Sequence, residues 1–578
     1  MQPVDFTTLT ATCAELRRGW LPARIEQFYQ RDRYTLAIAL RTLDKRDWLS
    51  ICWHSQAAHL CIGDPPPRTP DTFTFSDQLR HQLNGLALTG VVAIAPWERV
   101  IDFQFARRPG ETPQWHLYAE IMGKYSNLIL TDAHRQIVTC AHQVSSQKSS
   151  LRPIQTGQPY EPPPPLLNTA PSLEESRDRF SEQVSLVPGQ LKKQLLKSYR
   201  GLSPVLVESM VRMAGLDPQQ TTATLTPKDW QALFERWQEW LHCLEEESFT
   251  PAWTTTGYTV MGWEAIAPVK NTQTLLNRYY TNQLNQQTYK QLRHQLQQKV
   301  KSLQKKLDQK AQTFATRLAQ SDEADTYRGL GDLLMAHLHQ WQPGMAEIVL
   351  PDFTTGADIM IPLNPEKNAV QNAQALYKQH QKLKRARNAV QPLLAEVQAE
   401  QQYLEQIDTA LGQIDAYRNP EDLQTLTEIR EELIQENYLD GGQRRSRSQD
   451  APETQPHRYQ TPSGFELLVG RNNRQNDQLT FRLAGDYDLW FHAQEVAGSH
   501  VLLRLEPGSV PDATDLQFAA DFATYYSRSR QSDRVPVVYT EPKYVYKPKG
   551  AKPGVAIYQR EQVIWGQPRQ AAIYLQQS

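Results

Sequence analysis

Short apolar runs separated by polar turns dominate the first part of the chain. From Phe28 to about Leu130, the runs YTLAIAL, WLSICW, GVVAIA, VIDFQFA and WHLYAEIM are rich in β-branched and aromatic residues, as strands are. The first twenty residues instead space their apolar positions as an amphipathic helix does. We therefore predict a β-rich domain behind an N-terminal helix. The proline run EPPPPLL at 161–167 closes this domain, because consecutive prolines exclude a helix and a central strand alike.

A helical pattern continues from about residue 172 to 245. Within SYRGLSPVLVESMVRMAGLD, Gly201 and Pro204 predict a turn between two helices. Such a pair can present backbone amides to a phosphate group, but a plain packed helix pair has the same pattern. The sequence leaves both interpretations open.

Two long helices are predicted in the middle of the chain by different apolar repeats. The first repeat recurs every 11 residues, which gives a nearly straight helix: Tyr289, Leu292, Leu296, then Val300, Leu303, Leu307, then Ala311, Phe314, Leu318. The second recurs every seven residues, as in a coiled coil, with partners three positions later: Leu376, Leu383, Val390, Val397, Leu404, Leu411, and Ala386, Leu393, Ile407, Ile414. Pro392 should interrupt and kink this second helix, because it removes one backbone donor.

The segment between the two helices breaks both repeats. Residues from about 322 to 365 contain the strand-like runs MAEIVLPDF and ADIMIPL. The helices therefore fold back as an antiparallel pair with a small domain at the tip. At 1.5 Å per residue, the two arms reach roughly 45 and 60 Å.

A polar stretch precedes the last part of the chain. The sequence GGQRRSRSQDAPETQPHRYQ at 441–460 has almost no apolar residues, which predicts a disordered linker. From Phe465 onward, FELLVG, QLTFRLA, DLWFHA, HVLLRL, VPVVY and VAIYQ are expected as strands, with one helix around LQFAADFATYYSRS.

Composition narrows the classes of protein that remain. Lys and Arg number 62 against 63 Asp and Glu, so attraction to nucleic acid must come from local patches. The five cysteines form no CxxC pair and no His lies at zinc-ligand spacing, so we expect reduced structural thiols and no metal site. The N-terminus lacks an apolar core of signal-peptide length and no apolar stretch is long enough to span a membrane, so we expect a cytoplasmic protein.

Three motifs in the C-terminal part concentrate unusual polar residues: GRNNRQND at 470–477, DLWFHAQEVAGSH at 488–500 and YVYKPKGAKPG at 544–554. Gly470, Asn472 and Asn473 could simply form a turn, as could Gly498 with Ser499. His492 could be a core histidine beside Trp490. These structural alternatives stay open at the level of sequence.

Positive charge gathers around the third motif. From 528 to 552, seven cations stand against Asp533 and Glu541, a net charge of +5: Arg528, Arg530, Arg534, Lys543, Lys547, Lys549 and Lys552. Tyr544 and Tyr546 interleave with the lysines and could stack on unpaired bases. This segment is a candidate phosphate-binding patch, although a solvated basic loop would have the same composition.

The order GRNN..ND, D.WFH...GSH and YT...V.K..GAKPG.V.Y resembles the C-terminal RNA-binding domain of the NFACT proteins, called RqcH in bacteria, NEMF in animals, and in older usage fibronectin-binding protein A-like. GWLPARIEQFYQ, PWERVIDFQF at 96–105, EIMGKYSNLIL at 120–130 and NAVQNAQALYKQHQKLKRA at 368–386 also resemble family segments. The resemblance therefore covers essentially the whole chain.

This resemblance implies a multidomain α+β fold. Its parts are a β-rich NFACT-N domain at 1–168, a helix-hairpin-helix module at 169–270, an antiparallel coiled coil at 271–438 with its tip domain at about 322–365, a linker at 439–460, and an α+β NFACT-R domain at 461–578. In the family, an Asp-Arg pair of NFACT-N engages tRNA. The matching residues are Glu98 and Arg99, and the acid is one methylene longer than usual. For the NFACT-R domain, the motifs imply RNA binding by Arg471, Asn472, Asn473, Asn476, Asp477, His492, His500, Lys547, Lys549 and Lys552.

By the same resemblance, the protein binds a large ribosomal subunit obstructed by peptidyl-tRNA. It recruits alanyl-tRNA so that the stalled chain receives an untemplated C-terminal alanine tail, which marks it for degradation. A small RNA-binding quality-control cofactor is a further candidate partner. We expect no enzyme activity, because peptidyl transfer belongs to the ribosome, and no nucleotide cofactor, because GxxxxGK[ST] is absent.

Two alternative functions for this protein are suggested by the N-terminal architecture and by the older family name. The N-terminal architecture resembles formamidopyrimidine-DNA glycosylases, which use an N-terminal proline and a four-Cys zinc finger. Here Pro3 follows Gln2 and no Cys cluster exists, and an assay on oxidised DNA would test that activity. The older family name suggests a fibronectin-binding surface adhesin, which fractionation of cells would test.

Overall fold

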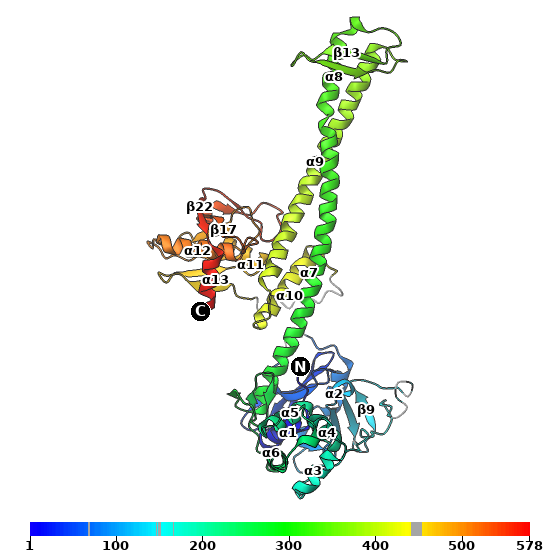
Figure 1. Ribbon diagram of the computed structural model, residues 1–578, viewed down its shortest axis with the longest axis vertical. Helices are drawn as coiled ribbons and strands as arrows, with labels where there is room; N and C mark the ends of the chain where they lie inside the picture. The colour runs from blue at the N-terminus through cyan, green and yellow to red at the C-terminus, as the bar shows by residue number, and fades with distance from the viewer. Residues whose placement is uncertain are drawn as a thin grey trace. The chain divides into compact units, whose positions relative to one another are not determined.

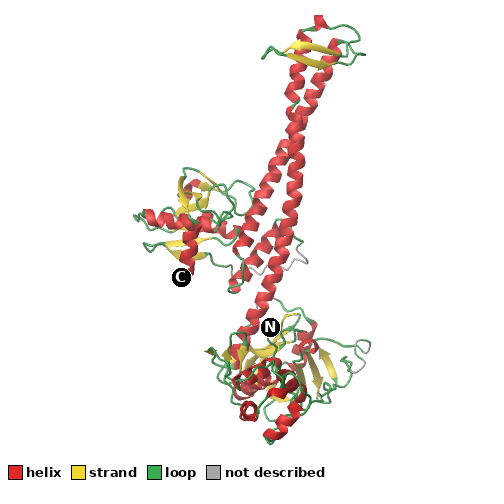
Figure 2. Cartoon of the chain, in the orientation of Figure 1, coloured by secondary structure: helices red, strands yellow, loops and turns green. Residues whose placement is uncertain are grey.

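The computed structural model describes residues 1–66, 70–145, 147, 149, 152–165, 167–440 and 454–577 (Figures 1 and 2). The chain divides into two compact units. The first comprises residues 1–285, and the second comprises the described residues from 286 onward. The fold is mixed α+β, as predicted.

The first unit is built on a nine-stranded antiparallel sheet in the order β4-β3-β2-β1-β5-β6-β7-β8-β9. The strands are β1 (Ala23–Asp32), β2 (Thr35–Arg41), β3 (Arg46–Cys52), β4 (His59–Gly63), β5 (Ala87–Ala93), β6 (Val100–Ala106), β7 (Trp115–Glu120), β8 (Asn127–Asp132) and β9 (Ile137–Cys140). The helices α1 (Phe6–Trp20) and α2 (Thr74–Leu83) contribute Leu9, Leu16 and Leu79 to the core of this sheet. The predicted β-rich domain behind an N-terminal helix is therefore present.

A helical cluster follows the sheet in the first unit. It consists of α3 (Arg177–Ser185), α4 (Leu191–Ser198), α5 (Pro204–Met213) and α6 (Pro227–Glu246), with the short strands β10 (Ala252–Trp253), β11 (Tyr258–Thr259) and β12 (Ala267–Pro268) after it. Trp237 and Trp240 are fully buried at its centre. Gly201 takes φ +80° between α4 and α5, and the side chain of Ser203 caps α5, so the predicted turn is confirmed.

A long helical hairpin begins the second unit. Its elements are α7 (Thr272–Asp322), which starts in the first unit, α8 (Ala324–Ala336), β13 (Glu347–Pro351), β14 (Asp358–Pro362), α9 (Ala369–Gln413) and α10 (Pro420–Gln435). Both apolar repeats meet in one core, where Leu296 and Val300 of α7 pack with Leu404 and Leu411 of α9. The two predicted strand runs pair as an antiparallel hairpin between the helices.

Two details of the second helix differ from the prediction. α9 continues through Pro392 to Gln413, so the predicted interruption is absent. Pro392 is exposed, so its ring faces solvent and the other backbone hydrogen bonds of the helix can still form. Leu393 is 43% exposed, so the seven-residue repeat does not bury that position.

The C-terminal domain of the second unit contains a six-stranded antiparallel sheet in the order β15-β16-β18-β17-β19-β22. Its elements are β15 (His457–Gln460), β16 (Glu466–Val469), α11 (Asn473–Gln478), β17 (Leu489–Ala493), β18 (Val501–Leu503), α12 (Ala513–Tyr525), β19 (Val535–Thr540), β20 (Val545–Tyr546), β21 (Ile557–Tyr558), β22 (Gln562–Gly566) and α13 (Pro568–Gln577). α12 packs against this sheet through Phe522.

Two predictions for this part of the chain were wrong. The run QLTFRLA forms a π-helical turn over Leu479–Leu483, because Asn472 caps α11 and carries the chain into a helix just before it. The predicted disordered linker at 439–460 ends in β15, whose residues pair with β16, and Thr454 is buried. Residues 441–453 of that prediction lie outside the described residues.

The five cysteines Cys13, Cys52, Cys61, Cys140 and Cys243 are free and buried, as expected for structural thiols. Within the described ranges, no helix combines the length and the apolar character that crossing a membrane requires.

Candidate nucleic-acid interface

The predicted tRNA-binding pair lies on a braced turn of the first unit. Glu98 and Arg99 connect β5 to β6, directly after Trp97, which takes the left-handed φ of 65°. The Trp97 ring packs against Phe6 of α1 at 4.9 Å and against Trp240 of α6 at 5.6 Å between centroids. Two helices distant in sequence, α1 and α6, therefore hold this turn in place.

Arg99 is anchored to the start of α1. Its Nη1 donates a hydrogen bond to the carbonyl of Val4 at 3.3 Å. Burial lowers the pKa of the guanidinium, while the nearby carboxylates of Asp5 and Glu98 act in the opposite direction. Arginine stays charged in any case, so the turn presents a half-buried cation held against acidic neighbours.

The same corner of the unit includes the turn between α4 and α5. Asp5 caps α1 through the amide of Thr8 and accepts a hydrogen bond of 2.6 Å from the hydroxyl of Ser203. A Cβ on Gly201 would lie 2.5 Å from the Trp97 ring. The structure thus brings together the Glu98–Arg99 motif and the Gly201–Pro204 turn, which the sequence patterns indicated separately.

The supporting residues Asp5, Trp97 and Ser203 were missed at the level of sequence. The local signals were a Trp immediately before the acidic-Arg pair and Asp or Ser residues at positions that begin helices. No local pattern indicates that these residues contact one another, because they lie almost 200 positions apart at the extremes.

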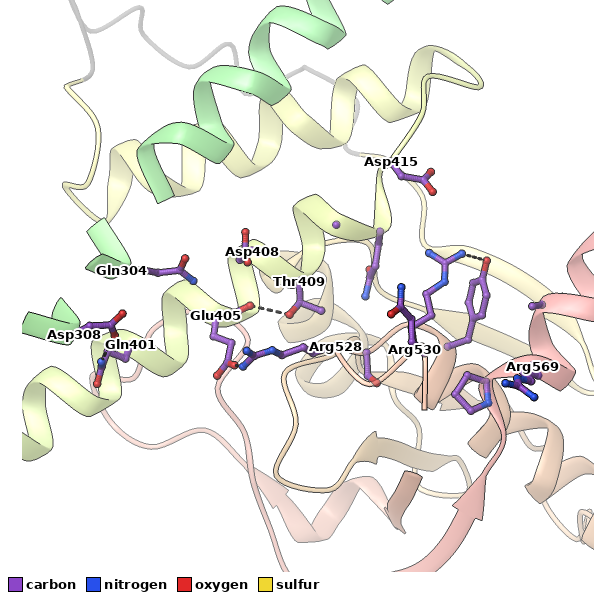
Figure 3. A pocket seen from close by; sticks show the side chains of 17 residues that line it. Gln304, Asp308, Gln401, Glu405, Asp408, Thr409, Asp415, Arg528, Arg530 and Arg569 are labelled. Atoms are coloured by element: carbon purple, nitrogen blue, oxygen red, sulfur yellow. Dashed lines mark hydrogen bonds and ion pairs between the residues drawn. The ribbon is translucent and has the colours of Figure 1, made fainter. Parts of the chain in front are cut away.

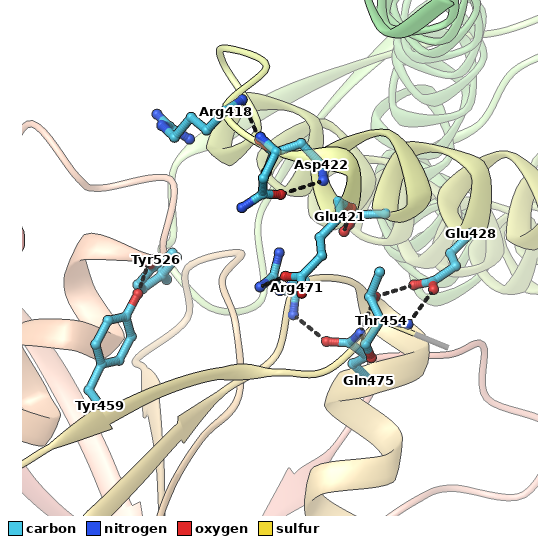
Figure 4. Close-up of polar contacts among 11 residues, drawn as sticks. Arg418, Glu421, Asp422, Glu428, Thr454, Tyr459, Arg471, Gln475 and Tyr526 are labelled. Carbon is cyan, nitrogen blue, oxygen red and sulfur yellow. Dashed lines mark hydrogen bonds and ion pairs between the residues drawn. The ribbon is translucent and has the colours of Figure 1, made fainter. Parts of the chain in front are cut away.

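In the second unit, the first C-terminal motif faces α10 (Figure 4). Asn472 Nδ2 donates to Glu428 at 2.8 Å, and Asn473 Nδ2 donates to Glu432 at 3.0 Å. Arg471 pairs with Glu421 at 2.6 Å. Asn472 and Asn473 are each 2% exposed. Their predicted contact with RNA is therefore not available in this arrangement, because carboxylates of the same chain occupy their donors.

Glu432 is the most deeply buried acid of this interface, with 1% of its surface exposed. Burial raises its pKa to about 7, against hydrogen bonds from Tyr403 and Asn473 that act in the opposite direction. Glu428 nearby accepts from both the amide and the hydroxyl of Thr454 (Figure 4). The interface is thus a buried polar network, which stabilises docking only while each group keeps its partner.

The second motif is also turned inward. His500 is 2% exposed, and its amide donates to Asn476 at 3.0 Å. Burial lowers the pKa of His500 to about 3 and that of His492 to about 4. Both rings contact Trp490. His492 therefore lies beside Trp490, as the core-histidine alternative has it, although its Nε2 has no hydrogen-bond partner among the described residues. Neither ring is a phosphate-binding cation at neutral pH.

The three lysines predicted to face RNA differ from one another. Lys547 pairs with Asp477, which also accepts from the amide of Gly554 at 3.0 Å. Lys552 bonds the hydroxyl of Tyr438 and lies 4.7 Å from the Tyr403 ring centroid. Lys549 is exposed. Of the three lysines, Lys549 alone is exposed, because Lys547 and Lys552 hold the loop against the rest of the unit.

A cavity of about 930 Å³ separates the helical hairpin from the C-terminal domain (Figure 3). Arg528, Arg530 and Arg569 line one wall, and carboxylates of α9 line the other. Arg528 crosses the cavity to pair with Glu405, and Arg530 lies 4.0 Å from the centroid of the Tyr525 ring. Much of the predicted basic patch is therefore neutralised by neighbouring groups, whereas Arg534 and Lys549 are exposed and have no ion-pair partner in the described part of the chain.

These features define a chain with a braced cationic turn in one unit and a polar α+β domain docked on a helical hairpin in the other. Comparison with known families identifies the class. The NFACT N-terminal and middle domains match residues 5–452, and the NFACT protein RNA binding domain matches residues 455–556. The protein belongs to the NFACT family, and its C-terminal domain is the family's RNA-binding domain.

Curated relatives agree with this assignment over nearly the whole chain. It is 30% identical over 570 residues to the Rqc2 homolog RqcH of Bacillus subtilis, covering 96% of each chain. It is 30% identical to the Rqc2 homolog RqcH of Streptococcus suis, covering 95% of each. Among solved structures, the C-terminal part of the fibronectin/fibrinogen-binding protein of Streptococcus suis is 32% identical, covers 48% of this chain and 95% of that chain, and has a TM-score of 0.38.

Proposed function

We propose that this protein binds large ribosomal subunits obstructed by peptidyl-tRNA and recruits alanyl-tRNA to them. Stalled nascent chains would then receive an untemplated C-terminal alanine tail that marks them for degradation. Membership of the ribosome quality-control family and the similarity to RqcH proteins along almost the entire chain support this proposal.

The observation that carries the proposal is the braced turn of Glu98 and Arg99. Phe6, Trp240 and Gly201 surround Trp97, so the adjacent guanidinium is held by packing. A preorganised guanidinium can engage a phosphate group or a base edge with little loss of conformational entropy. In this proposal the ribosome's RNA performs peptidyl transfer and the protein contributes positioning of tRNA.

The test is co-sedimentation of the full-length protein with large subunits that carry peptidyl-tRNA, with bound tRNA measured separately. Arg99→Ala should abolish tRNA recruitment while subunit binding stays nearly unchanged. Glu98→Asp should be tolerated, since it restores the usual family residue. Arg33→Ala is the matched control, because Arg33 is an exposed arginine on the turn between β1 and β2.

Arg99→Lys refines this test, since it keeps the charge but not the planar fork of donors. Equal loss of tRNA and subunit binding in Arg99→Ala would contradict the proposed division of labour. Retention of tRNA in Arg99→Ala would contradict the role of the turn itself.

A further inference from the structure

Another cavity in the second unit has acidic and aromatic residues in its lining. It measures about 920 Å³ and lies between α9 and the loops around β17 and β21. Its lining includes Trp490, Tyr403 and Tyr558, of which only Tyr558 is partly exposed, since Trp490 and Tyr403 are each 1% exposed. This size and these rings are typical of a site for a side chain or a small planar group.

Carboxylates dominate the charge of this cavity. Glu396, Glu400 and Glu495 line it, and none of them has an ion-pair partner among the residues that the structure describes. Glu405 also lines it but pairs with Arg528. The three unpaired carboxylates leave a site that favours a cation.

The one lysine of the lining does not neutralise them. Lys552 bonds the hydroxyl of Tyr438 and lies 4.3 Å from the Tyr438 ring centroid and 4.7 Å from that of Tyr403. Its ammonium is therefore already held by two rings.

Two buried polar atoms of the lining lack hydrogen-bond partners in the described part of the chain. They are Oε1 of Gln406 and Nε2 of His492. Buried polar atoms normally have a partner, and leaving one without costs free energy. An amide oxygen only accepts hydrogen bonds, so the missing group at Gln406 is a donor.

We propose that this cavity binds an arginine side chain of a basic protein segment. A guanidinium supplies five donors for Gln406 and the carboxylates, and its flat face can stack on the partly exposed ring of Tyr558. A nucleotide fits less well, because three carboxylates at one site repel its phosphate. Arginine binding in this cavity is independent of tRNA recruitment by Arg99, which lies in the other unit.

The test measures binding of fluorescein-labelled peptides to the full-length protein by fluorescence polarisation. One hexapeptide alternates Gly and Arg, and its match replaces each Arg by citrulline, which keeps the planar group but removes the charge. We expect the arginine peptide to bind at least about tenfold more tightly than the citrulline peptide. Glu400→Gln combined with Glu495→Gln should weaken the arginine peptide by about tenfold or more.

Glu347→Gln combined with Glu366→Gln is the control, since both acids are exposed near the tip hairpin. Gln406→Leu should also weaken the arginine peptide, because it removes the acceptor. Equal binding of the two peptides would overturn the proposal, as would a loss of binding in the control as large as that in the cavity variant.

Tight binding of a labelled adenosine hexanucleotide that is lost in Gln406→Leu would also overturn the proposal, because the cavity would then hold a nucleobase. Thermal melting of each variant verifies that the fold is retained.

Discussion

At the residue scale, the backbone conformation of Gly201 determines how closely the chain packs against Trp97 beside the candidate tRNA site. Its φ of +80° is a conformation that L side chains rarely adopt, and a Cβ there would lie 2.5 Å from the Trp97 ring. Trp97 in turn precedes Glu98 and Arg99. The glycine therefore matters for the position of the guanidinium although it contacts no ligand.

Gly201→Ala should destabilise the first unit by about 2–4 kcal/mol, combining backbone strain with overpacking against Trp97. It should also weaken tRNA recruitment. Gly215→Ala is the matched control, since Gly215 has φ +77° and a Cβ added there would meet nothing within 4 Å; its cost should be limited to about 1 kcal/mol of backbone strain. Chemical denaturation measures both, and equal destabilisation would show that the contact with Trp97 is unimportant.

Lys549 and Lys552 of the third motif have different surroundings, so their substitutions should have different effects. Lys549→Ala should flatten the salt dependence of RNA binding by roughly 0.7–0.9 of a log–log unit and leave stability unchanged, because this side chain is exposed. Lys552→Ala should instead lower stability by about 1–2 kcal/mol, because it loses the contacts with Tyr403 and Tyr438. The measurements are RNA binding over a salt series and thermal melting. The reverse pattern would contradict the distinction between the two lysines.

At the scale of elements, α10 is the helix on which the C-terminal domain docks. Asn419 and Asp422 form its capping box, so its start is determined locally. Its acidic side chains Glu421, Glu428 and Glu432 then meet the motif that begins at Arg471. The carboxylates on one face of α10 thus accept the hydrogen bonds that side chains of the RNA-binding motif would otherwise donate to RNA.

The buried acid of α10 makes this docking dependent on pH. The pKa of Glu432 rises from 4.5 to about 7, so the folded state keeps its proton at pH values where the unfolded state has lost it. Stability should fall by up to about 3 kcal/mol as pH rises from about 4.5 to 7. Glu432→Gln should remove this part of the pH dependence in urea unfolding between pH 4.5 and 8. An unchanged profile would mean that Glu432 titrates normally.

At the scale of the whole molecule, the proposed function assigns different tasks to the two units. The first presents the Glu98–Arg99 turn, and the second carries the hairpin, its tip and the docked RNA-binding domain. The net charge of −1 over 578 residues conceals these local differences, so binding to RNA depends on where cations remain unpaired.

Docking of the RNA-binding domain can be disrupted without touching its own core. Asn473→Asp places a second carboxylate beside Glu432, and Glu432 loses the hydrogen bond that the Asn473 amide donates. The free energy of unfolding should fall by about 2–4 kcal/mol. Hydrogen exchange of amides in α10 and α11 should accelerate at neutral pH. Asn388→Asp is the control, since Asn388 is exposed on α9. Unchanged exchange in Asn473→Asp would indicate that the docked interface does not depend on this hydrogen bond.

Local patterns were sufficient for most elements of this protein. The 11-residue and seven-residue repeats predicted α7 and α9 because helical periodicity is a property of neighbouring residues. Gly201 with Pro204 predicted a turn for the same reason. The family motifs added the order of domains, since three multi-residue motifs in sequence leave few alternatives.

Contacts between distant segments were decided only by the tertiary structure. Asn472, Asn473, His500 and Lys547 were expected at an RNA surface, yet they hydrogen-bond within the second unit. A polar side chain has the same sequence signature whether it faces solvent or a buried carboxylate, because burial depends on segments that fold against it from elsewhere in the chain. Sequence therefore determined the elements and the family, and the packing of those elements determined which polar residues remain free to bind.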